Sequence, residues 1–284
     1  MTCLANLCLA LAGRYFGVEK VINTSDRFVD WRRHPLCRRY ILVVSESQFA
    51  HLGGQEHGQP NLMVQWATGF LADGQSELMG VWSTAVMAWP ELLEDLQVRG
   101  VEDVRYWSSN GLSNTEHFLC SVFPLATLMP LTGRGMRGDL EGVSARDFSA
   151  AAEMLESLRT SCTADAARSA VARLRAAPFG AKFQAKVERW EAAVGQSEPF
   201  FALAPRLQRF MLAADSVVGR LSRVSRRALT AHGPFVDADS AASFLLEVLG
   251  RAERDLARKA VPAVRFGGAR WPRVRESSLR GAAL

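Results

Sequence analysis

The sequence predicts an α/β protein in which a mixed β-sheet with two short helices is followed by a long all-helical part. Apolar and β-branched runs separated by Gly-containing turns dominate residues 40–84. From residue 89 the apolar spacing becomes helical for one segment, then alternates between strand and helix. From residue 144 onward the spacing is helical throughout. With 48% apolar and 22% charged residues, the composition is that of an ordinary globular protein.

Three strands are expected first. The run YILVV at 40–44 follows a cationic cluster and precedes a polar turn that contains Gly53 and Gly54. A second apolar run occupies 62–71, and a turn at 72–74 leads to a third strand at 78–82. Two Gly-containing connections of this kind predict antiparallel hairpins.

The next four elements alternate between helix and strand. Leu92, Leu93 and Leu96 have helical spacing within 89–99, and Gly100 is a plausible C-terminal cap. A strand is expected at 101–107, a helix at 116–123 and a fifth strand at 125–131. Three antiparallel strands, a helix, a strand, a helix and a strand is the element order of the RNase H-like fold. We therefore predict an RNase H-like mixed-sheet core with an all-helical insertion and a helical C-terminal part.

The helical part has apolar seams such as Phe183, Val187 and Trp190. Pro199 and Pro205 interrupt it, and a basic helix resumes at 207–229. A last helix is expected at 240–260, and the tail after 265 lacks periodicity. Residues 1–30 suggest two short helices around a glycine, an outline that helix-turn-helix proteins share with many proteins that never touch DNA. The expected parts are a helical N-terminal remnant at 1–35, core strands and helices at 36–135, a helical insertion at 136–205, C-terminal helices completing the core at 206–264 and a basic tail at 265–284.

The net charge and the cysteine pattern limit which partners and which kinds of site are expected. The formal net charge is +5, and its basic side chains are almost all arginine, which suits nucleic acid but also an arginine-rich surface without a partner. The five cysteines form no C-x-x-C pair, so we expect neither a disulfide framework nor a zinc site, and a reducing cytoplasm fits best. No apolar run reaches the roughly 20 residues of a membrane span, so no membrane partner is expected.

A series of motifs carries a resemblance to a known family. LMGVW at 78–82, LQVRGVEDV at 96–104, NGL at 110–112 and VFP at 122–124 follow one another in a fixed order. Upstream lies WRRHPL at 31–36 with Tyr40, and downstream lie PFF at 199–201, AADSVV at 213–218 and HGPF at 232–235. In this order and spacing the chain resembles the Mutator-family bacterial insertion-sequence transposases.

The resemblance implies enzymes that cut and join DNA at the inverted repeats of a transposable element. Their three acidic residues hold two Mg²⁺ ions about 4 Å apart. In this sequence the acidic positions fall on Ser45, Asn110 and Val218, which cannot supply the required negative charge. We therefore expect a degenerate, N-terminally shortened copy that holds no metal cofactor and whose status as an enzyme is uncertain.

Neighbouring residues offer weak substitutes for the missing acids. Glu46 lies on the opposite face of its strand from Ser45, because strand side chains alternate. Asp215 lies three residues before Val218, on a similar helix face, and Asn110 could offer only a neutral oxygen. We do not expect these three to form a working two-metal site.

The stronger binding candidate is the basic helix. Arg220, Arg223 and Arg227 share one face by their spacing, a stripe suited to phosphates, although a solvated face without a partner has the same pattern. The expected partners are DNA, bound by Arg220, Arg223, Arg226 and Arg227, and either a second copy or an intact transposase. The alternatives are a non-catalytic module that binds DNA or a transposase, and an unrelated α/β protein with accidental motif matches.

Overall fold

The computed structural model describes residues 34–53, 62–84, 89–109, 115–129, 143–256 and 261–264. The expected N-terminal helices, Asn110 and the basic tail lie outside these residues. The first part of the described chain holds five strands and two helices in the predicted order: β1 (Arg39–Ala50), β2 (Leu62–Phe70), β3 (Ser76–Thr84), α3 (Trp89–Val98), β4 (Asp103–Ser109), α4 (Thr115–Val122) and β5 (Thr127–Leu128).

The five strands form one mixed sheet in the order β3-β2-β1-β4-β5. β1 pairs antiparallel with β2, which pairs antiparallel with β3, while β4 runs parallel to β1 and to β5. This topology confirms the predicted α/β fold class, and it is consistent with an RNase H-like core.

Two strands differ most in length from the prediction, although β3 is also longer than expected. β1 continues to Ala50, well beyond the apolar run at 40–44, because the polar residues from Ser45 to Gln48 are paired with β2 on one side. β5 is only two residues long, since it pairs with β4 at Tyr106 and Trp107 alone. The central position of β1 explains why a strand with polar residues is buried over most of its length.

The remaining described helices are α5 (Ala145–Arg159), α6 (Ala164–Ala176), α7 (Pro178–Lys182), α8 (Gln184–Gln196), α9 (Glu198–Phe201), α10 (Pro205–His232) and α11 (Ala238–Leu256). Side chains of Ser144 and Thr163 cap α5 and α6 by accepting backbone N–H groups. Pro205 ends the preceding run and also begins α10, where a proline costs no hydrogen bond. Gly233, with a φ of +80°, ends α10 in a conformation that favours glycine.

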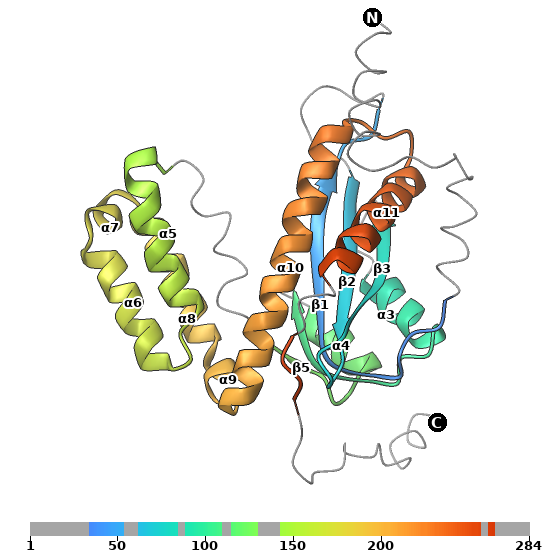
Figure 1. Cartoon of the computed structure of the whole chain (residues 1–284), viewed down its shortest axis with the longest axis horizontal. Helices are drawn as coiled ribbons and strands as arrows, with labels where there is room; N and C mark the ends of the chain where they lie inside the picture. The colour runs from blue at the N-terminus through green and yellow to red at the C-terminus, as the bar shows by residue number, and fades with distance from the viewer. Residues whose placement is uncertain are drawn as a thin grey trace, which may run out of the picture.

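Two helical layers enclose the sheet (Figure 1). α10 and α11 cover one face, where Val44, Phe210 and Leu245 belong to one apolar core. α3 and α4 cover the other face, where Val43, Leu96 and Trp107 belong to a second core. Adjacent residues of β1 therefore face different layers, which decides where each candidate site residue points.

Arg99 has a structural role in the Arg-Gly motif that contributed to the resemblance. Its side chain is 5% exposed and donates from Nη1 to the Met79 carbonyl oxygen at 2.6 Å and from Nε to the His34 carbonyl oxygen at 3.0 Å. Gly100 follows with a φ of +101°, which ends α3. The motif thus fixes the end of α3 against β3 and against the segment that leads into β1.

The helices α5, α6 and α8 form a bundle with its own core, which includes Leu158, Leu174 and Trp190. In Figure 1 the bundle stands apart from the sheet, on the far side of α10. Gln208 of α10 joins the two parts. Its Nε2 donates to the carbonyl oxygens of Cys162 at 2.9 Å, Phe200 at 3.2 Å and Phe201 at 3.3 Å.

Candidate functional site

Ser45 lies in the middle of β1, opposite Ala67 of β2 and beside Ser109 of β4. Its side chain is buried, and its Oγ accepts a hydrogen bond from Trp107 Nε1 at 3.0 Å. Trp107 stacks on Phe123 within the core beneath α3 and α4. Ser45 therefore faces the α3 and α4 layer.

Val218 lies on the other side of the sheet. It is fully buried in α10, in the core that α10 and α11 form against the sheet. The structure does not bring the side chains of Ser45 and Val218 together, because the sheet separates them. Asn110 is outside the described residues, and β4 ends one residue before it, at Ser109 next to Ser45.

Glu46, the residue after Ser45 in β1, has its side chain on the α10 side of the sheet. Ser222 of α10 donates from Oγ to Glu46 Oε2 at 3.2 Å. Gln48 Nε2 lies 3.2 Å from the Ser222 carbonyl oxygen and 3.3 Å from its Oγ. All three residues are less than 10% exposed, so they form a buried polar network between the strand and the helix.

This contact confirms that Ser45 and Glu46 point to opposite faces. The sequence did not predict this network. The alternation of strand side chains places Ser45 and Glu46 on opposite faces, but it does not reveal which face α10 covers. The available signal was the polar pair Glu46 and Gln48, two residues apart on one face of a strand that is otherwise apolar on that side.

Asp215, the other possible substitute, is buried on α10 with 3% exposure. It precedes Ser222 by seven residues, which is about 10 Å along a helix. Asp215 therefore lies about two helical turns from Ser222, whose hydroxyl donates to Glu46.

A cavity of about 480 Å³ lies beside the C-terminal end of β1, next to the network of Glu46, Gln48 and Ser222. The end of β1 and the C-terminal part of α10 enclose it, and its lining includes Ser47, Gln48, Arg226 and Thr230. Pairing between β1 and β4 reaches only to Ser45, so the strand beyond that residue borders the cavity. Arg226 Nη2 lies 3.4 Å from Ser222 Oγ, which joins the cavity to the buried network.

The four predicted DNA-binding arginines are on α10, but they do not form one group. Arg223 and Arg227 are exposed on the solvent side of the helix and Arg220 is half-buried beside them. Arg226 is turned toward Ser222 and the cavity. In the part of the chain that the structure describes, none of the ion pairs includes any of the four. Their positive charge is thus available to an external anion.

The sheet order and the long helix that follows the helical bundle define an α/β protein, and the topology is consistent with an RNase H-like core. The chain belongs to the Mutator family of transposases, because the profile described as "Transposase, Mutator family" matches residues 18–258.

Curated relatives agree with this assignment. The transposase for insertion sequence element ISRM3 of Rhizobium meliloti is 25% identical over 226 residues, which cover 78% of this chain and 56% of the relative. A probable transposase of an ISRM3-like element of Sinorhizobium fredii matches to the same extent. A probable transposase from Corynebacterium diphtheriae is 25% identical over 182 residues. The chain thus spans about half the length of the curated relatives it matches.

Members of this family typically depend on a divalent metal. Hard cations such as Mg²⁺ prefer carboxylate oxygens. Ser45 and Val218 offer none, and Glu46 brings one carboxylate to Ser222. Among the described residues, no three His, Cys, Asp or Glu side chains gather where they could hold a metal ion. The described residues therefore do not fit a two-metal site. Separately, none of the helices described here is long and apolar enough to cross a membrane.

Proposed function

We propose that this chain is a transposase-related DNA-binding protein whose cleavage site is impaired. The observation that carries the proposal is the difference between the two sides of α10. Its sheet side contacts one carboxylate, Glu46, through Ser222, and its solvent side presents arginines without acidic partners among the described residues. As a DNA-binding protein of this family, it would act in the cytoplasm.

The impairment follows from the chemistry of strand cleavage. Two metal ions activate the attacking oxygen and stabilise the leaving oxygen, and several carboxylates must converge to hold them. The resemblance assigns two of the family's acidic positions to Ser45 and Val218, and neither residue carries a carboxylate. No cleavage step is therefore assigned to this chain.

Retained DNA binding is supported by charge and exposure. Arg223 and Arg227 are one helical turn apart on the exposed side of α10, and Arg220 extends the same row. Guanidinium groups bind phosphate oxygens in pairs of hydrogen bonds, and each phosphate contact releases a counterion.

A strand-cleavage assay tests the proposal. Purified chain is incubated with Mg²⁺ or Mn²⁺ and with duplexes that carry the terminal repeats of ISRM3 or the sequences flanking its own gene. The intact ISRM3 transposase on its own ends is the positive control. We expect DNA binding without cutting, and metal-dependent nicking above the level of a heat-inactivated sample would contradict the impairment.

A second candidate function is a non-catalytic module that pairs with an intact transposase. The retained RNase H-like sheet, together with the lost acidic positions, favours it, because a protein of this kind can occupy a place in an assembly without cutting. Light scattering after mixing the chain with intact ISRM3 transposase tests it. A mixed complex, accompanied by reduced cleavage, is the expected result, and two unmixed species with undiminished cleavage would contradict it.

A further inference from the structure

Among the described elements, α10 carries a strong excess of positive charge. α10 contains six arginines and a single acidic residue, Asp215, which is buried. Its formal charge of +5 equals the net charge of the whole chain. On the other face of the sheet, α3 carries Glu91, Glu94 and Asp95 and no basic residue. An approaching polyanion is therefore directed to the α10 side.

Arg206 and Arg209, near the start of α10, belong to the same face as Arg220, Arg223 and Arg227. Residues 18 apart on an α-helix are separated by five full turns, so Arg209 and Arg227 project in the same direction. Arg220 is within about 20° of that line, and the buried positions of α10, such as Phe210, Ala214 and Leu221, occupy the opposite side. One row of arginines thus runs along nearly the whole helix.

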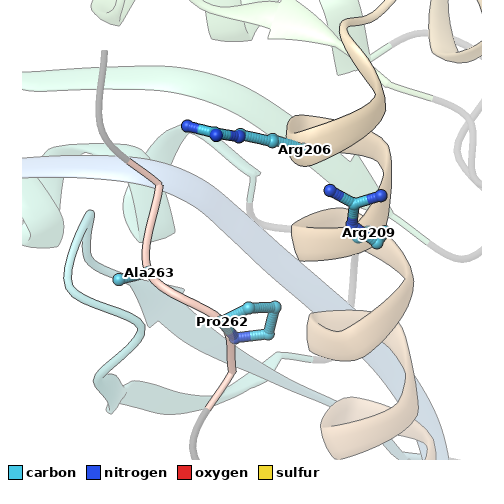
Figure 2. A pocket seen from close by; sticks show the side chains of 4 residues that line it. All are labelled: Arg206, Arg209, Pro262 and Ala263. Carbon is cyan, nitrogen blue, oxygen red and sulfur yellow. The ribbon is translucent and has the colours of Figure 1, made fainter. Parts of the chain in front are cut away.

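Arg206 and Arg209 also line a cavity of about 400 Å³, together with Pro262 and Ala263 (Figure 2). In Figure 2 the two arginines extend from α10 on one side of the opening and the 262–263 backbone borders the other. This cavity is at the opposite end of α10 from the one that contains Arg226.

The far wall of this cavity is held in place by the turn between β2 and β3. Val264 N–H donates to the Ala72 carbonyl oxygen at 2.8 Å, and Val261 and Val264 are buried. Both arginines are exposed, and in the described part of the chain neither has a carboxylate partner. Two adjacent guanidinium groups without a counter-charge, beside a fixed wall, suit a phosphate group.

We propose that Arg206 and Arg209 form a second phosphate-binding point for duplex DNA, on the same helix as Arg223 and Arg227. The two pairs are about 25 Å apart along α10, at 1.5 Å per residue. B-DNA repeats about every 34 Å, so the two pairs contact phosphates within one helical turn. This inference rests on the proposed DNA binding. It adds that the duplex contacts α10 at two points, one near each end of the helix.

Fluorescence anisotropy with a 25-base-pair duplex, between about 50 and 200 mM salt, tests this inference. We expect the double variant R206A/R209A to bind at least tenfold more weakly at low salt. Because each lost phosphate contact lowers the slope of log K against log salt by about 0.9, the slope should fall by about 2. On a duplex of about 6 base pairs, too short to reach both points, the loss should be much smaller.

The control is R168A/R175A, which removes the same charge from exposed arginines of the helical bundle. It should change affinity and salt slope little. If R223A/R227A weakens binding while R206A/R209A matches the control, the second phosphate point is wrong and the proposed DNA binding stands. If the unaltered chain shows no salt-sensitive DNA binding, the proposed function itself fails. Circular dichroism of each variant checks that its helices are intact.

Discussion

At the scale of single residues, the direction of each side chain in β1 decides what the site can do. Ser45 accepts its hydrogen bond from Trp107 in the α3 and α4 layer, while its neighbour Glu46 reaches Ser222 on α10. If a site residue in a strand is assigned one position too early or too late, its side chain is therefore placed on the wrong side of the sheet.

Val218→Glu, the substitution that would restore a carboxylate at that position, should destabilise the fold. Val218 is fully buried among apolar side chains, and an unpaired carboxylate there costs about 3 kcal/mol or more. Urea unfolding measures the loss. Val224→Glu is the matched control, because Val224 is 40% exposed on the same helix and should change stability by about 0.5 kcal/mol or less.

Gly69→Ala should destabilise the sheet because Tyr40 occupies the space above Gly69. An added Cβ would lie 2.4 Å from two carbons of the Tyr40 ring, whose hydroxyl donates to Glu77 on the edge strand. We expect a loss of about 1–3 kcal/mol in thermal or urea unfolding. Gly195→Ala, where a Cβ meets nothing within 4 Å, should be neutral or stabilising. Equal effects at the two positions would contradict the packing described.

At the scale of elements, α11 covers the sheet edge at β3 with a partly buried acid. Glu253 accepts a hydrogen bond from the backbone of Leu78 on β3, and its Oε1 has no partner among the described residues. Burial, followed by the nearby charge of Glu77, raises the pKa of Glu253 to about 7.

Stability should therefore fall as pH rises between about 4.5 and 7, because the unfolded carboxyl ionises in that range while the folded one keeps its proton. Glu253→Gln should remove this decline and be more stable than the unaltered chain at pH 7.5 by roughly 1–3 kcal/mol. Urea unfolding at pH 4.5, 6 and 7.5 measures it. Glu247→Gln is the control, since Glu247 is exposed on the same helix and pairs with Arg251. An unchanged pH profile in the Glu253 variant would refute the assignment.

Much of the element order could be predicted from sequence, because glycine turns and apolar periods are local signals. The start of α10 at Pro205 and the end of α3 at Gly100 are of this kind. The extent of β1 could not be predicted, since Glu46 and Gln48 are strand residues only because β2 pairs with them and α10 supplies Ser222. The buried network depends on contacts between residues more than 170 positions apart, which no local pattern contains.

At the scale of the whole molecule, Gln208 connects the helical bundle to the core. The side chain is 3% exposed and donates to three carbonyl oxygens around the junction. α10 thus has three roles, because it completes the core, anchors the bundle and carries the arginine row.

Gln208→Ala should loosen this junction, because it removes the amide donor that links α10 to the carbonyl oxygens of Cys162, Phe200 and Phe201, at a cost of about 1–3 kcal/mol. We expect the single thermal transition to broaden or split, and limited proteolysis between α9 and α10 to become faster. Gln196→Ala, an exposed position at the end of α8, should behave like the unaltered chain. A sharp, unchanged transition in the Gln208 variant would show that the bundle is held by other contacts.

We propose that the chain keeps the scaffold of its family, while its described residues supply too few carboxylates to hold a pair of catalytic metal ions. Mn²⁺ titration followed by electron paramagnetic resonance, in the presence of bound duplex DNA, tests this claim most directly. The account predicts no stoichiometric Mn²⁺ binding by this chain and clear binding by the intact ISRM3 transposase under the same conditions. Stoichiometric Mn²⁺ binding that Glu46→Gln abolishes would contradict it.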